Sequence, residues 1–183
     1  MSRLEGTSPK GGGLNEQKVN SEGQALTSAV VQSEIEHESE ANGASYIWAT
    51  DLVDAAAADA TILLLKNTSD TPLHIDEVRV SSGVTTSEYT IHLPTAEVTL
   101  TGGATVTGTN LNTGSSNVAE ASAQSNETNN AQGNVIGTVF LAVDRHKDFA
   151  FPGLILGKNK SIGVDVVADA SEASVEILGH YQD

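Results

Sequence analysis

The stretch TILLLKNTSDTPLHIDEVRVSS, residues 61–82, decides the fold class of this chain. It opens with an apolar run, passes through the polar turn sequence NTSDTP, and continues with apolar side chains at alternate positions. A short apolar run bounded by turn residues predicts a buried strand, and the alternation predicts a second strand with one face in a core. The inward positions of the second strand are Leu73, Ile75, Val78 and Val80. The extra residue between the two pairs predicts a β-bulge near Asp76–Glu77.

Similar patterns recur along the chain from residue 45 onward. The further candidate strands are SYIWAT (45–50), SEYTIHL (87–93), AEVTLTG (96–102), GNVIGTVFLAVD (133–144), GLILG (153–157), SIGVDVVAD (161–169) and ASVEILGHY (173–181). The last two strands are expected to form a terminal hairpin that turns at DASEA, residues 169–173. Roughly eight to ten strands separated by Gly, Asn, Ser and Thr turns, with almost no helical periodicity, predict an all-β fold: an antiparallel β-sandwich of jelly-roll-like type.

Residues 1–44 differ in composition and predict an extended polar N-terminal arm, followed by the sandwich domain at residues 45–183. Glycine and polar residues dominate as far as Gly23, which is typical of flexible chain. Every second position is then acidic, at Glu34, Glu36, Glu38 and Glu40. In an extended strand this spacing places four carboxylates on one side. We therefore expect a short strand that ends at the Asn42–Gly43 turn, with a row of metal-binding carboxylates as the alternative.

The stretch TGTNLNTGSSNVAEASAQSNETNN, residues 107–130, contains only two large apolar side chains, Leu111 and Val118. Such a segment buries too little apolar surface to become ordered by itself, although the alternation at residues 117–126 predicts an edge strand for part of it. Loops of this length in compact domains are usually functional or held by a neighbour. We expect this one to pack between subunits or on an assembly surface, and a mobile exposed loop is the alternative.

The charge of the chain limits the classes of partner. Its 183 residues include 24 Asp plus Glu against 9 Lys plus Arg, a net charge of -15. This charge disfavours nucleic acid and anionic membranes, since binding there depends on clustered Lys and Arg. It either serves solubility alone or suits a basic partner surface. The N-terminus has no apolar signal-peptide region, and the longest apolar run, ATILLL, is too short to span a bilayer. We expect a soluble protein made in the cytoplasm.

The sequence contains no recognisable catalytic motif. It has no cysteine, no glycine-rich phosphate loop, no His-Glu-x-x-His and no Gly-x-Ser-x-Gly, and its five histidines are scattered. We therefore predict that the chain is no enzyme and has no catalytic, cofactor-binding or metal-binding residues, although the turn at Asp165–Glu172 leaves a calcium site open. His92 and His180 are expected on the surface or lining a pocket. The sequence VDRHKDF, residues 143–149, is expected to be a charged hairpin turn, with an acid–base cluster as the alternative.

Four stretches of the chain together resemble a group of tailed-phage virion proteins. They are KVNSEGQALTSAVVQSEIEHESEANGASYIW (18–48), ILLLKNTSDTPLHIDEVRV (62–80), TGTNLNTGSSNVAEASAQSNET (107–128) and LGKNKSIGVDVVADASEASVEILGHY (156–181). The resemblance implies a jelly-roll-like sandwich that attaches to the capsid or to another part of the virion, often as an oligomer. Proteins of this group include head decoration (cement) proteins and head or tail fibres. The group has no catalytic residues that apply to this chain.

The resemblance and the residue patterns predict a capsid decoration or cement protein on the virion surface. Its expected partners are the major capsid protein and further copies of itself, with a homotrimer preferred, and neither nucleic acid nor membrane. A head or tail fibre that binds a host surface is the alternative, and a polysaccharide-degrading enzyme is a remote one. Arms of this kind bind by adding strands to a neighbour's open sheet edge. The expected assembly contacts are Val30, Val31, Ile35, Leu111 and Val118.

Overall fold

The computed structural model describes residues 33–55, 60–127, 133–167 and 172–182, together with two short strands near the N-terminus. These are β1 (Glu5–Gly6) and β2 (Asn15–Glu16), which pair antiparallel. The chain divides into two compact units, residues 1–32 and 33–183. Most of the predicted N-terminal arm therefore lies outside the described residues, and residues 33–44 belong to the second unit.

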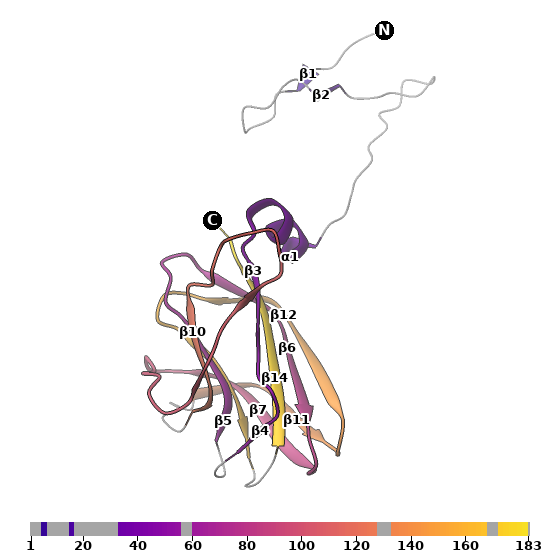
Figure 1. Ribbon diagram of the computed structural model, residues 1–183, viewed down its shortest axis with the longest axis vertical. Coiled ribbons are helices and arrows are strands. Elements are labelled where there is room, and N and C mark those ends of the chain that lie inside the picture. The colour runs from indigo at the N-terminus through magenta and orange to yellow at the C-terminus, as the bar shows by residue number, and fades with distance from the viewer. Residues whose placement is uncertain are drawn as a thin grey trace, which may run out of the picture. The chain divides into compact units, whose positions relative to one another are not determined.

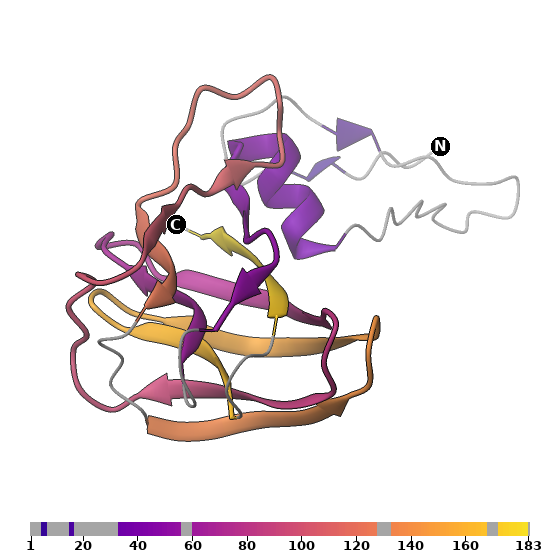
Figure 2. The ribbon, with the colours of Figure 1, turned by 60° about the horizontal axis from the view of Figure 1, so that its bottom comes forward.

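Two antiparallel sheets, packed face to face, form the second unit, so the predicted all-β sandwich is confirmed (Figure 1). The first sheet has the strand order β11 (Gly133–Leu141), β7 (Ser87–Pro94), β13 (Ser161–Val166), β5 (Thr61–Asn67), β10 (Ala121–Glu127) and β8 (Ala104–Val106). The second has the order β12 (His146–Leu156), β6 (Leu73–Ser82), β14 (Glu172–Tyr181), β3 (Ser45–Ala49) and β9 (Thr109–Asn110), with β4 (Val53–Asp54) beside β14. Figure 2 shows the two layers, with β7 and β11 in the lower one and β6 and β12 above them.

The two strands predicted in residues 61–82 are confirmed as β5 and β6. The predicted inward side chains of β6 are almost completely buried: Leu73, Ile75, Val78 and Val80. The predicted bulge is also present. Leu178 and Gly179 are consecutive in β14 and lie opposite Glu77 and Ile75 of β6, so Asp76 is the extra residue with no opposite residue in the β6–β14 pairing. The extra residue returns the apolar side chains to the core after the slip in the pattern.

No two paired strands in the described part of the sandwich are consecutive in the chain. The predicted terminal hairpin is therefore wrong, because β13 belongs to the first sheet and β14 to the second. The charged turn near residue 144 likewise joins β11 to β12 across the two sheets, so it is a turn but not a hairpin. Apolar alternation shows that a strand has a buried face. It does not show whether the next strand lies beside it or opposite it across the core.

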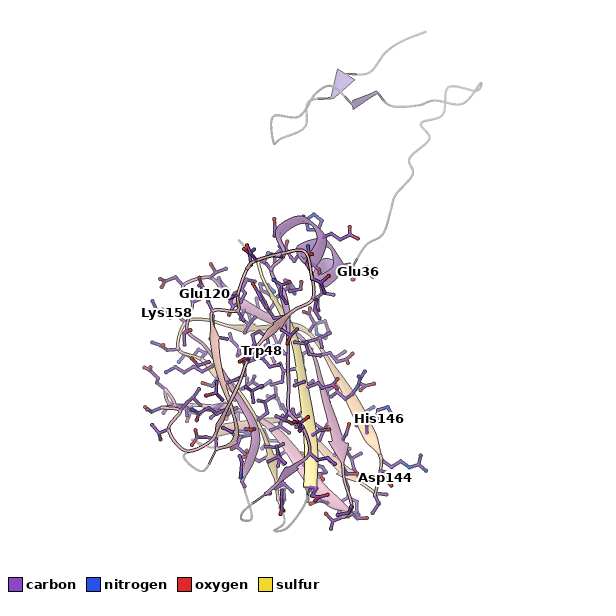
Figure 3. The ribbon with its side chains drawn as sticks, in the orientation of Figure 1. Glu36, Trp48, Glu120, Asp144, His146 and Lys158 are labelled. Carbon is purple, nitrogen blue, oxygen red and sulfur yellow. The ribbon has the colours of Figure 1, made fainter. Side chains whose placement is uncertain are left out.

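The core lies between the sheets and is centred on β5, β6, β13 and β14. Trp48, Leu63, Ile162 and Ile177 are fully buried there, and Figure 3 places Trp48 between the two layers. Burying a side chain of this size stabilises the folded state by about 1.5–3 kcal/mol relative to leaving it in water. This apolar surface is sufficient reason for the strands to stack as two layers.

The connection from β7 to β8 crosses the outer side of the first sheet, since these strands lie on either side of β13, β5 and β10. Lys66 Nζ of β5 donates to Glu97 Oε1 at 2.8 Å and to the Val98 carbonyl at 2.9 Å. Glu127, fully buried, accepts from the backbone N–H groups of Thr101 and Gly102 at 3.0 and 3.1 Å. Polar contacts thus fasten this crossing segment to the sheet.

The expected extended strand at Glu34–Glu40 is wrong, because these residues form α1 (Glu34–His37) and the π-helical turn η1 (Glu38–Asn42). A capping box begins the helix: Ser33 N–H donates to Glu36 Oε2 at 3.0 Å, and Glu36 N–H donates to Ser33 Oγ at 3.4 Å. Hydrogen bonding of the Glu36 carboxylate to the backbone N–H of Ser33, and to the Ser33 side chain, lowers the pKa of Glu36. Gly43, in the left-handed conformation with φ 59°, ends the segment where the Asn42–Gly43 signal predicted a turn.

The alternative of a metal-binding carboxylate row is not supported by this conformation. Glu38 is buried whereas Glu36 and Glu40 are exposed, so these carboxylates do not share one face. In the described part of the chain, no group of three His, Asp or Glu side chains is arranged to hold a metal ion. Nor is either described helix, α1 or η1, long and apolar enough to cross a membrane.

Candidate functional site

The insert, defined here as residues 107–120, arches beside α1 at one end of the sandwich (Figures 1 and 2). It leaves the first sheet after β8, pairs with β3 of the second sheet through β9, and returns to the first sheet at β10. The strand predicted from the alternation at residues 117–126 is confirmed as β10, Ala121–Glu127. It is not an edge strand, however, because β10 pairs with β5 on one side and with β8 on the other.

Three asparagine side chains hold the insert against the end of η1. Asn110 Nδ2 donates to the Gly43 carbonyl at 2.8 Å and to the Asn117 carbonyl at 3.0 Å. Asn112 Nδ2 donates to the Ser39 carbonyl at 2.9 Å, and Asn117 Nδ2 donates to the Asn42 carbonyl at 2.9 Å. The carbonyls at the C-terminal end of a helix have no partners within that helix, so these side chains satisfy acceptors that would otherwise need water.

The chain itself therefore supplies part of the order of the insert, and the expected packing of residues 107–130 between subunits or on an assembly surface stays a prediction. The asparagine cluster (Asn110, Asn112 and Asn117) donates hydrogen bonds to backbone carbonyls of the same chain. Two backbone contacts add to them: Leu111 N–H donates to the Ser45 carbonyl at 2.9 Å, and Asn112 N–H donates to Asn110 Oδ1 at 2.8 Å. Hydrogen bonds from polar side chains to backbone carbonyls thus order this segment, although it has little apolar surface to bury.

The insert, η1 and the ends of β3 and β14 surround an open pocket of about 430 Å³. The lining side chains used below are Glu38, Tyr46, Ser69, Val118, Glu120 and Tyr181. The Glu120 carboxylate accepts from Ser69 Oγ at 2.5 Å, and the buried Glu38 carboxylate accepts from Asn42 Nδ2. Figure 3 places Glu120 and Glu36 towards this end of the sandwich and Asp144 and His146 towards the other.

The electrostatics of the pocket favour positively charged or hydrogen-donating groups. Burial raises the pKa of the Tyr46 phenol and of the Tyr181 phenol, and the negative charge of Glu120 raises both further. Both phenols therefore stay protonated at neutral pH. Among the described residues that line the pocket there is no Lys or Arg. Carboxylates beside uncharged hydroxyl and amide groups suit an ammonium or guanidinium group, which forms charge-assisted hydrogen bonds.

The structure brings some of the predicted assembly contacts to this end of the molecule. Val30 and Val31 lie outside the described residues. Ile35 is half-buried in α1, and its carbonyl accepts from Ser45 Oγ at 2.9 Å, so Ile35 and Leu111 both bond to Ser45. The Leu111 side chain is 40% exposed and that of Val118 is 78% exposed. The side chains of Leu111 and Val118 are thus available to a partner. The backbone is held at Leu111 by the Ser45 carbonyl and, next to Val118, at Asn117, whose carbonyl accepts from Asn110.

Sequence reasoning missed the asparagine cluster, the pocket and both of its tyrosines. The alternation Asn110-x-Asn112, with Asn117 nearby, is a signal that could have indicated side chains able to bind backbone. The positions of their carbonyl partners depend on the helical conformation of residues 34–42, for which the sequence pattern predicts an extended strand.

The expectation that His92 and His180 lie on the surface or line a pocket is wrong. His92 Nε2 lies 2.8 Å from Asp165 Oδ2 with both side chains buried, and His180 Nδ1 lies 2.8 Å from Asp76 Oδ2. The Asp165 carboxylate of β13 is therefore buried against the His92 ring of β7. Residues 168–171 of the turn considered for calcium lie outside the described residues.

Comparisons of the chain with family models, curated proteins and solved structures found no match. A function for the chain is therefore inferred from the surfaces described above and from the sequence.

Proposed function

We propose that this chain is a structural protein of a tailed-phage virion, a decoration or cement component that binds the head shell and stabilises it. Its contact surface is the insert face, defined by the exposed residues Leu111, Val118 and Glu120 together with the pocket that the buried Glu38 lines. The carrying observation is that Leu111 and Val118 expose apolar side chains on a backbone that the asparagine cluster holds in place. Exposed apolar side chains on a fixed backbone favour binding, because little conformational entropy is lost when a partner covers them.

The charges of the insert face support a partner with basic character. Glu120 is exposed beside Val118, and the pocket behind them favours a Lys or Arg side chain. In this proposal the major capsid protein supplies that basic group, and copies of the chain occupy the capsid surface as a homo-oligomer, for which a trimer is our expectation. The trimer follows from analogy between folds only.

The test is reconstitution on shells of the encoding phage that have been stripped of the protein. We expect the full chain to saturate the shells, and the double variant Leu111→Ser/Val118→Ser to bind about tenfold more weakly or worse, since two apolar contacts are lost. Val84→Ser is the matched control, because Val84 is 67% exposed but is not part of the insert face. Occupancy is measured by cryo-microscopy of the particles. Equal occupancy by the double variant, or no binding of the full chain, would contradict the proposal.

The alternative is a head or tail fibre module that binds a host surface. The pocket favours this second candidate, because its carboxylates and hydroxyls could also receive a polar host ligand. The two candidates differ in which particle surface the chain occupies and in what it binds. Adding the purified chain to host cells and to stripped shells separates them, since a decoration protein binds shells and a fibre module binds cells.

A further inference from the structure

The two strands at one edge of the sandwich, β11 and β12, differ in how well they are protected against pairing with a strand of another chain. β12 carries His146, Lys147 and Asp148, and its pairing with β6 is interrupted between Ala150 and Leu154. Within this interruption Pro152 is followed by Gly153 at φ 94°. Charges, proline and bulges are the usual means by which an edge strand avoids pairing with another chain.

β11 has almost none of this protection. It is nine residues long, contains no charged residue, and pairs only with β7 among the described strands. Its one irregularity is a register shift between Val135 and Gly137. The opposite edges of the two sheets, β8 and β9, are only three and two residues long. β11 is therefore the one long, uncharged edge among the described edge strands of the sandwich.

The side chains of β11 add an apolar surface to this open edge. Val139 packs against the core and Leu141 is buried within it, so the intervening Phe140 points outward and is 70% exposed. Val135 is 59% exposed and Ile136 36% exposed. A row of unpaired backbone groups beside exposed apolar side chains is a template for another strand or for a matching apolar surface.

We infer that copies of this chain associate with one another through the β11 edge, so that a second copy covers Val135 and Phe140. The charge of the chain indicates this occupant. Two copies of a protein with a net charge of -15 repel each other over most of their surface, and an uncharged strand is where they can approach at least electrostatic cost. A basic partner would instead be attracted to the carboxylates elsewhere, such as those of the insert face.

This inference specifies the contact of the homo-oligomer within the proposed function, and it does not depend on shell binding. The insert face lies at the end of the sandwich near α1, and β11 lies along the far edge of the first sheet. The two surfaces are separate, so one can bind a shell while the other binds a second copy.

The test is the mass of the full chain in solution, measured by sedimentation and light scattering over a range of concentrations. We expect two or three times the 18.9 kDa of one chain, and a monomer for Phe140→Lys at the same concentrations. Phe140 lies opposite Glu88 of β7, so the introduced Lys gains a cross-strand ion pair and the fold is retained. Val84→Lys is the matched control, since it adds the same charge at an equally exposed apolar position, and it should remain oligomeric.

Hydrogen exchange of the full chain provides a second measurement that does not rely on a variant. Protection at residues 135–140 should rise with protein concentration, whereas protection along β12 should not. A monomeric full chain, an oligomer that survives Phe140→Lys, or exchange in β11 that is independent of concentration would each overturn the inference. A Phe140→Lys chain that is monomeric and still saturates shells supports the inference. A full chain that is oligomeric but binds no shell refutes only the proposed function.

Discussion

The sandwich core and the insert are ordered by different forces. The core around Trp48 and Ile177 consists of apolar side chains removed from water between two sheets. The insert has two large apolar side chains, both at least partly exposed, and is held instead by the amides of Asn110, Asn112 and Asn117. The difference shows that low apolar content does not by itself make a segment disordered. A segment can also be ordered where carbonyl groups at a helix end need donors.

The two regions meet at Trp48. Its indole ring is fully buried in the core, and its Nε1 lies close to Gly108 at the start of the insert. Substitutions in the core, at this junction and in the insert should therefore have effects that differ in size and extent.

The largest expected effect is in the core. Ile177 is fully buried and lies between Trp48 and Val78 of the neighbouring strands. Ile177→Ala should lower the free energy of unfolding of the whole sandwich by about 2–5 kcal/mol, because it loses apolar burial and leaves a cavity. Urea denaturation measures the change. Leu52→Ala is the control, since Leu52 is 59% exposed and its loss should change stability by less than about 0.5 kcal/mol.

The junction should be the next most sensitive position. A Cβ atom on Gly108 would lie 2.6 Å from Trp48 Nε1 and 2.8 Å from Ala119 Cβ. Gly108→Ala should therefore cost about 1–3 kcal/mol through overpacking and shift the fluorescence of Trp48, the one tryptophan of the chain. Gly114→Ala is a suitable comparison, because its nearest neighbour would lie at 3.4 Å. Equal stability of the two variants would show that the insert does not pack on the core.

The insert itself should respond more locally. Asn110→Ala removes two donated hydrogen bonds and the acceptor of the Asn112 N–H, so we expect a loss of about 1–3 kcal/mol. Hydrogen exchange should accelerate at residues 109–117 while β5 and β13 keep their protection. Thr113→Ala, an exposed position in the same loop, should leave exchange unchanged. Unaltered exchange in Asn110→Ala would mean that the asparagine cluster does not order the insert.

The smallest effect at neutral pH is expected for Tyr181→Phe. Burial and the charge of Glu120 raise the pKa of Tyr181 above its ordinary 10.0, so the folded state holds the phenol proton more tightly than the unfolded state. The stabilising contribution is fully present below pH 10 and is lost as the pH rises from there towards the folded pKa. Thermal melting should show a shallower alkaline decline for Tyr181→Phe than for the unaltered chain. Parallel declines would contradict this assignment.

The fold class could be predicted from sequence because it depends on local patterns. The run at residues 61–67, the alternation at residues 73–80 and the extra residue at Asp76 each specify a strand or a bulge without reference to other parts of the chain. The pairing of the strands could not be predicted in this way. Apolar alternation in β13 and β14 is equally compatible with a hairpin and with two strands facing each other across a core.

The site was harder to predict because it combines segments that are far apart in sequence. The capping box at Ser33 and Glu36 was present in the sequence, but the alternating glutamates favoured a strand and obscured it. Because the helical turn was not predicted, the positions of the carbonyl groups that accept from the asparagines could not be predicted either. Leu111 and Val118 were identified only because they are the sole large apolar side chains in a polar segment, and their role in assembly remains a prediction.

The most direct test of the claim that the chain orders its own insert is hydrogen exchange of the unaltered protein at a concentration where it is monomeric. The structure predicts slowed exchange at Leu111 and Asn112, whose N–H groups donate to the Ser45 carbonyl and to Asn110 Oδ1. Exchange of these two amides at the rate of unfolded chain, in a monomer whose β5 and β13 remain protected, would contradict it.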